Sequence, residues 1–160
     1  MKQPPGDIDL AYKPSSPAFR YQNYPFYWNA RVGNRYAQVM EATLKPLGLT
    51  ITGWRICLIL SEHKTLSVSD ISTHSAVKLS TVTKTVYSME DKGLLRVARR
   101  KSDARVTEVS LTAAGTKTIK NVVAETAEFL DRALENFDNA DIERLNELLA
   151  RLFSNLGESK

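Results

Sequence analysis

The segment from Ser67 to Leu111 places a short helix, a tight turn, a second helix and a basic β-hairpin directly after one another. The first helix begins at a capping-box pattern in which Asp70 follows Ser67 by three residues. Apolar side chains line one side of the second helix at spacings of three and four: Leu79, Val82, Val86 and Met89. Gly93 is placed to end this helix. The order predicts a helix-turn-helix followed by a hairpin wing.

The predicted hairpin pairs residues 94–99 with residues 106–111 around an unusually basic tip. Residues 78–105 hold eight Lys/Arg and three Asp/Glu, an excess of +5, whereas the whole chain has a net charge of only +4. Local positive charge of this kind indicates a polyanionic partner, because neutralising phosphates releases condensed counterions. The alternative is an ordinary solvated basic face.

The outer face of the second helix carries hydroxyl groups and a lysine, which suit the major groove of DNA. Ser80 is expected to cap this helix. In the wing, arginine suits the negative potential of the minor groove. We expect Asp103 to orient Arg105 by a charge-assisted hydrogen bond, the alternative being a turn capped locally by aspartate. The residues expected to contact DNA are Lys78, Ser80, Thr81, Thr83, Lys84, Tyr87, Arg100, Lys101, Asp103 and Arg105.

Helical patterns flank this segment, so the expected fold is mainly α with a small β-wing. A seam of apolar and small residues begins at Phe26, a long amphipathic helix follows Thr112, and a last helix follows Asp138 or Asn139. These apolar stripes exceed what one small lobe can bury and predict a dimer, the alternative being a bundle folded back on its own domain. The expected regions are a proline-rich arm, disordered alone or packed on another element (1–22), a first dimerisation helix (23–49), a winged helix-turn-helix lobe (50–112) and C-terminal dimerisation helices (113–157).

No pattern in the chain predicts catalysis, a metal or a cofactor. His63 and His74 lie eleven residues apart with no second ligand at helical spacing, and His63 is expected to end a helix. Cys57 sits within an apolar helix and is expected to be a buried, inert thiol. The longest apolar run, residues 56–60, is far too short to cross a membrane. A soluble, cytoplasmic protein without a membrane partner is expected.

Four pieces of the chain resemble the MarR-type family of winged helix-turn-helix transcriptional regulators. They are Ser80-Thr81-Val82-Thr83, Met89-Glu90-Asp91-Lys92-Gly93-Leu94, Asp103-x-Arg105 and Val109-x-Leu111-Thr112-x-x-Gly115. The chain departs from the family at Ser75, where leucine is usual, at Ala76, where glycine is frequent, and in a shorter wing tip. The resemblance implies a homodimer that binds a pseudo-palindromic operator in double-stranded DNA and usually represses transcription.

The resemblance also implies a small effector, often an aromatic acid. Aromatic and arginine side chains alternate in "YPFYWNARVGNRY" and "TGWRI", and an aromatic wall with guanidinium groups suits an aromatic carboxylate or a phosphorylated ligand. The stretch is similar to the branch that controls degradation of aromatic acids such as hydroxycinnamates, some of which respond to the coenzyme A thioester. The expected effector residues are Tyr27, Trp28, Arg31, Arg35, Trp54 and Arg55. Alternatively, Trp28 and Trp54 belong to the core and the arginines to the surface or to an interface.

Two further hypotheses come from other classes of protein. A nonspecific architectural DNA-binding protein without an effector would bind all sequences with similar, salt-sensitive affinity. A structural helical dimer, kept soluble by its basic patch, would not bind DNA at physiological salt.

Overall fold

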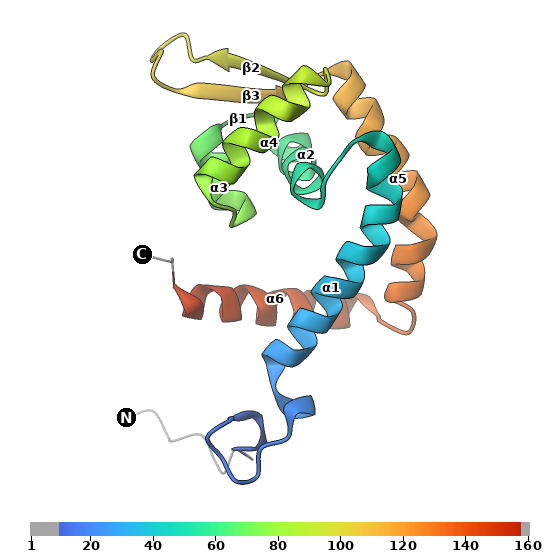
Figure 1. Cartoon of the computed structure of the whole chain (residues 1–160). Coiled ribbons are helices and arrows are strands. Elements are labelled where there is room, and N and C mark those ends of the chain that lie inside the picture. Colours follow the sequence, from blue (N-terminus) through green and yellow to red (C-terminus); the bar gives the residue numbers. More distant parts are fainter. Residues whose placement is uncertain (1–9, 158–160) are drawn as a thin grey trace. The chain divides into compact units, whose positions relative to one another are not determined.

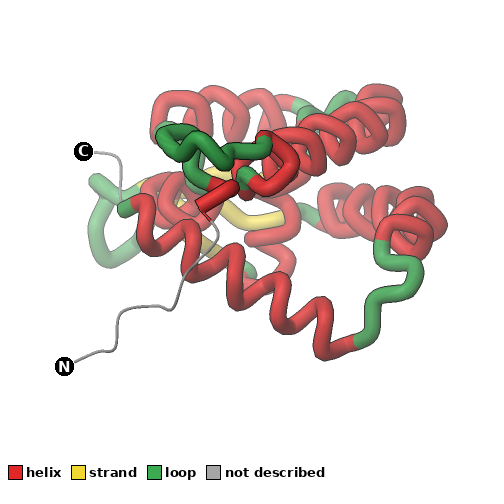
Figure 2. The backbone as a smooth tube through the Cα atoms, turned by 90° about the horizontal axis from the view of Figure 1, so that it is seen from below, coloured by secondary structure: helices red, strands yellow, loops and turns green. Residues whose placement is uncertain are grey.

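The computed structural model describes residues 10–157 and confirms a mainly α-helical fold with a small antiparallel sheet (Figures 1 and 2). The chain divides into two compact units between Val122 and Val123. The elements are, in order, η1 (Leu10–Tyr12), η2 (Tyr21–Asn23), α1 (Pro25–Leu44), η3 (Lys45–Leu47), α2 (Ile51–His63), β1 (Thr65–Ser67), α3 (Val68–Ser75), α4 (Leu79–Asp91), β2 (Leu95–Arg99), β3 (Thr107–Leu111), α5 (Ala113–Ala133) and α6 (Asn139–Leu156).

The proline-rich arm lies partly outside the described residues, which begin at residue 10. Within it, η1 and η2 are short 3-10 helices, and Ala11 is buried. The Trp28 indole of α1 donates a hydrogen bond to the carbonyl oxygen of Gln22 at 2.7 Å. This bond ties η2 to the first turn of α1.

The core of the first unit joins α2, α3, α4 and the sheet. Each contributes side chains without exposed surface, such as Ile56, Ile71, Val86 and Val109. Burying one such side chain stabilises a fold by about 1.5–3 kcal/mol. Because the apolar face of α4 is held here, its opposite face points away from the core.

Local sequence signals set most helix boundaries. The Ser67–Asp70 capping box of α3 is present, and Thr50 caps α2. Asp138 caps α6, and Thr112 Oγ1 accepts a hydrogen bond from the backbone N–H of Gly115 at 3.0 Å. The predicted capping box at Ser67 and the predicted helix starts after Thr112 and after Asp138 are confirmed.

Two predictions at the start of α4 are wrong. Lys78, not Ser80, is the N-cap residue, because the tight turn after α3 lets the helix begin at Leu79. Ser72 fixes this turn by donating its hydroxyl to the carbonyl oxygen of Val77 at 2.7 Å. The second wrong prediction placed Leu79 on the apolar side of the helix with Val82, Val86 and Met89. Leu79 is 51% exposed, because it stands at the first helical position beside the wing rather than over the core.

The sheet has the order β1-β3-β2, and all neighbours are antiparallel. Strands β2 and β3 match the predicted hairpin to within one residue, and Val97 pairs with Val109. Strand β1 was not predicted, because three residues are too few to show an alternating pattern. It pairs along β3, with Leu66 opposite Val109.

Ala76, at the end of α3, has φ +52° and ψ +37°, in the left-handed region. A left-handed conformation costs a non-glycine residue about 1–2 kcal/mol, while glycine raises the entropy cost of folding by about 0.4–1 kcal/mol. We therefore expect Ala76→Gly to raise the free energy of unfolding by about 0.5–1 kcal/mol, measured by urea denaturation. Ala127→Gly, within α5, is the control and should lower it by up to about 1 kcal/mol. A lower stability for Ala76→Gly would contradict the strained turn.

Candidate nucleic-acid interface

The outer face of α4 carries the residues that the sequence assigned to the major groove. Ser80, Thr81, Lys84 and Tyr87 are exposed, as is Lys78 at the helix start. Thr83 is half-buried, and its hydroxyl donates to the carbonyl oxygen of Leu79 at 2.8 Å. The Thr83 oxygen is therefore left to accept a hydrogen bond from a ligand.

In the wing, Asp103 fixes the guanidinium of Arg105. Arg105 donates from Nε to Asp103 Oδ1 at 3.1 Å and from Nη2 to Oδ2 at 3.2 Å. The Arg105 side chain is nevertheless 91% exposed. The backbone N–H of Arg105 also donates to Asp103 Oδ1 at 3.0 Å. Asp103 therefore both orients the Arg105 side chain and caps the turn locally. The result is an exposed cation in a defined orientation.

The hydrogen bonds from Arg105 lower the pKa of the Asp103 carboxyl below its ordinary value. A lowered folded-state pKa means that the pair is fully formed above the unfolded value of about 3.9 and is lost as the pH falls through the folded value. The Asp103–Arg105 pair is thus retained across the neutral range.

Arg100 is bound within the wing itself. Its Nε donates to Glu108 Oε1 at 2.6 Å, and its backbone N–H donates to the carbonyl oxygen of Val106 at 2.8 Å. Lys101, in contrast, is exposed and makes no ion pair with any other residue in the range 10–157. Glu108 was missed in the sequence, because its pairing across the hairpin depends on the strand register.

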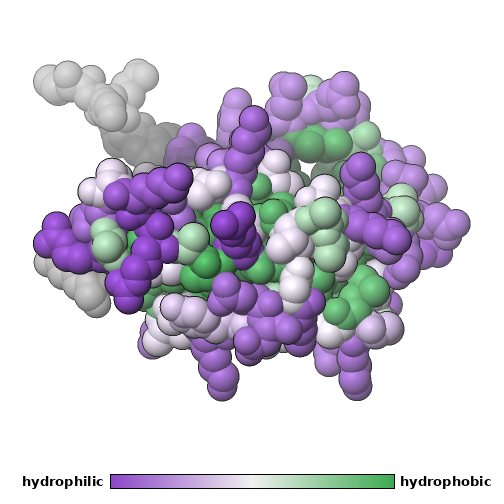
Figure 3. Space-filling model, turned by 90° about the horizontal axis from the view of Figure 1, so that it is seen from above, coloured by the Kyte–Doolittle hydropathy of each residue, from purple (hydrophilic) through white to green (hydrophobic). Residues whose placement is uncertain are grey.

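A hollow of about 350 Å³ lies between α4 and the wing. Leu79, Thr83 and Tyr87 line it from α4, and Arg105 with Thr107 from the wing. Figure 3 views the chain from above, the side on which Figure 1 shows β2, β3 and α4, and hydrophilic side chains project around apolar patches there. Helix, hollow and wing form one continuous surface.

Three of the six expected effector residues come together at the start of α1. Arg31 Nη1 donates to the Tyr27 hydroxyl at 2.7 Å. The same guanidinium lies 5.4 Å from the Tyr27 ring centroid and 5.7 Å from that of Trp28. Trp28 is 50% exposed, so the alternative that placed it in the core is wrong. Arg35, on the same helix, is also exposed.

The other two expected effector residues have different surroundings. Trp54 is only 5% exposed and belongs to the hydrophobic core, as the alternative stated. Arg55 Nη1 donates to the carbonyl oxygen of Ser75 at 3.1 Å, at the end of α3. The structure therefore gives Trp54 a packing role and Arg55 a role in fixing the helix-turn-helix.

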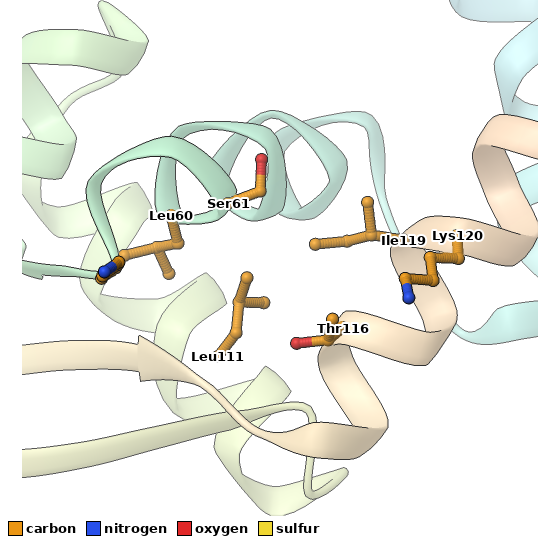
Figure 4. Close-up of a pocket in the computed structure, with 7 residues that line it drawn as sticks. Leu60, Ser61, Leu111, Thr116, Ile119 and Lys120 are labelled. Atoms are coloured by element: carbon orange, nitrogen blue, oxygen red, sulfur yellow. The ribbon is translucent and has the colours of Figure 1, made fainter.

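A cavity of about 380 Å³ lies where α2, β3 and the first turns of α5 meet. Figure 4 shows Leu60, Leu111 and Ile119 directed toward one another, with Thr116 and Lys120 on the α5 side. Lys64 adds a second ammonium group. Apolar walls with cations at the rim suit a small organic anion. Sequence reasoning missed this cavity, because α2 and α5 are about fifty residues apart in the chain.

The single cysteine, Cys57, is free and buried. Burial raises the pKa of the Cys57 thiol to about 12, so it is protonated at neutral pH. Between residues 10 and 157, no group of three or more His, Cys, Asp or Glu side chains is placed to hold a metal ion. In the same range, no helix is long and apolar enough to span a membrane.

A helix-turn-helix whose second helix lies beside a basic hairpin defines a winged helix-turn-helix DNA-binding protein. A sequence model of the MarR family matches residues 49–107, which contain this motif. The HTH-type transcriptional repressor IacR of Pseudomonas putida is 42% identical over 145 residues, covering 91% of this chain and 87% of IacR. The chain therefore belongs to the MarR family, whose members are transcriptional regulators and not enzymes.

Solved structures show the same fold. A MarR-family transcriptional regulator from Silicibacter pomeroyi superposes with a TM-score of 0.78 at 20% identity, over 88% of this chain and 95% of that one. NadR, solved in complex with 4-hydroxyphenylacetate, superposes with a TM-score of 0.69 at 24% identity, over 77% of this chain and 87% of NadR.

Proposed function

We propose that this protein is a homodimeric repressor that binds a pseudo-palindromic operator and is released by a small aromatic acid. The observation that carries the proposal is the exposed, oriented Arg105 beside the polar outer face of α4. The repressor IacR, 42% identical, supports the direction of regulation. Such a repressor acts in the cytoplasm.

In this proposal the first turns of α4 enter the major groove, with hydroxyls and Lys84 contacting base edges and phosphates. Arg105 and Lys101 reach the minor groove or the flanking backbone. Arg100 has a different part: its ion pair with Glu108 holds the wing in shape.

Exposed apolar side chains support a homodimer. On α6 they recur at helical spacing: Leu145, Leu148, Leu149, Phe153 and Leu156. On α1, Val32 is exposed. Among residues 10–157, no heavy atom outside the adjacent residues and the nearby backbone of α1 lies within 4 Å of where a Cβ at Gly33 would stand. Contiguous apolar faces that are exposed to water cost free energy unless a partner covers them. A second copy of the chain offers the same faces in return.

The effector proposal rests on the cluster of Tyr27, Trp28 and Arg31, with the cavity between α2 and α5 as a second candidate site. A guanidinium over aromatic rings suits the carboxylate of an aromatic acid, whose own ring can stack on Trp28. NadR was solved with such an acid, 4-hydroxyphenylacetate. The coenzyme A thioester of an aromatic acid is the other effector that we propose to test.

The test is fluorescence anisotropy with labelled DNA from immediately upstream of the protein's own reading frame, beside a scrambled duplex, across a salt series. We expect binding to the upstream DNA to be at least ~10³-fold tighter than to the control. Aromatic acids and their thioesters are then added to find the one that releases the DNA.

Each contrary result would favour another class of protein. Equal affinity for both duplexes, with operators at other promoters excluded, favours the architectural DNA-binding protein. Lack of binding to any duplex at physiological salt leaves the structural helical dimer.

A further inference from the structure

His63 and His74, eleven residues apart in the sequence, are neighbours in the fold. Their ring centroids are 5.0 Å apart, with 28° between the ring planes. His63 is the last residue of α2, and His74 lies in the last turn of α3. Both are exposed, and neither takes part in the DNA-binding surface described above.

This separation matches that of two imidazoles bound to one metal ion. With metal–nitrogen bonds of about 2.1 Å and bond angles between square and tetrahedral, the ring centroids of two such ligands lie roughly 4.5–5.2 Å apart. The two rings are stacked in the structure, so both side chains have to rotate before one nitrogen of each ring points at a common ion. Both are exposed, and exposed side chains rotate within nanoseconds.

The electrostatic surroundings also suit a cation. The carboxyl ends of α2 and α3 both carry partial negative charge. Asp70, one turn before His74, is hydrogen-bonded to Ser67 and also interacts electrostatically with Arg100 and with His74. Glu62 and Lys64 flank His63 in sequence and have opposite charges.

We propose that His63 and His74 together bind one divalent transition-metal ion of the class that prefers imidazole, which includes Zn²⁺, Ni²⁺ and Cu²⁺. Water completes the coordination. The ion joins the last residue of α2 to the last turn of α3 and so restrains the first helix of the helix-turn-helix. This site is independent of the proposed effector.

The test titrates Zn²⁺ into the full-length, tag-free, chelator-treated protein by calorimetry, with His63→Gln, His74→Gln and the double variant alongside. We expect one Zn²⁺ per wild-type chain, and a loss of affinity of about tenfold or more in each single variant. Since one ion needs both rings, the double variant should lose little more than either single one. Zn²⁺ should raise the melting temperature of the wild type only.

Melting temperatures in chelator should be equal for all four proteins, because both side chains are exposed. The proposal is overturned if the wild type takes up no Zn²⁺ at millimolar concentration, or if the double variant keeps wild-type affinity. It is also overturned if the losses in the two single variants add, which would indicate two independent weak sites.

Discussion

Gly115→Ala is expected to lower the free energy of unfolding by about 3 kcal/mol or more. A Cβ at this position would stand 2.1 Å from the carbonyl oxygen of Leu94 and 3.1 Å from Leu111 Cδ2. The oxygen belongs to the backbone and accepts a hydrogen bond from the N–H of Thr112 at 3.1 Å. The Thr112 hydroxyl lies 3.1 Å from the same oxygen and makes its shorter bond, 2.7 Å, to the carbonyl oxygen of Gly93. Helix α5 therefore has to move away from the start of β2, which breaks the N-cap hydrogen bond from Gly115 to Thr112.

Urea denaturation measures this change, with Ala114→Ser as control. Ala114 is the exposed neighbour on the same turn of α5, and its replacement should alter the stability by less than about 0.5 kcal/mol. An unchanged urea midpoint for Gly115→Ala would show that α5 does not approach the start of β2 as closely as described.

Arg105→Ala is expected to weaken operator binding by about 1–3 kcal/mol for each wing. The proposed homodimer would use two wings on one operator, so the dissociation constant should rise roughly 30-fold to 10⁴-fold. The salt dependence should also become shallower, by about one ion for each lost phosphate contact. Fluorescence anisotropy on the operator, across a salt series, gives both quantities.

Arg144→Ala is the matched control, because Arg144 on α6 forms a similar local pair, with Glu147 at 3.1 Å. Its operator affinity and thermal stability should stay close to those of the wild type. If Arg105→Ala binds the operator as tightly as the control, the wing has no part in recognition.

The Asp103→Asn variant tests whether the wing binds DNA through its net charge or through the fixed orientation of Arg105. This variant gains one net positive charge but loses the charge-assisted bonds that orient Arg105. Weaker operator binding is expected because orientation matters more than one added charge at an exposed site. Tighter binding in the same anisotropy assay would mean that the wing acts only through its charge.

The sequence by itself determined the features that depend on neighbours a few residues apart. The Ser67–Asp70 capping box, the helix stop at Gly93 and the bond from Arg105 to Asp103 all join positions two to five residues apart. Local hydrogen bonds and steric limits decide such features almost regardless of the rest of the fold. The same holds for the order of helices and hairpin, which follows from their periodicity.

Only the tertiary structure decided which side chains face the core and which distant residues meet. Trp28 and Trp54 look alike in the sequence, but long-range packing exposes the first and buries the second. His63 meets His74 because α2 packs on α3. Periodicity shows that a helix has an apolar side but does not identify the element that covers it, since burial depends on contacts between segments far apart in the chain.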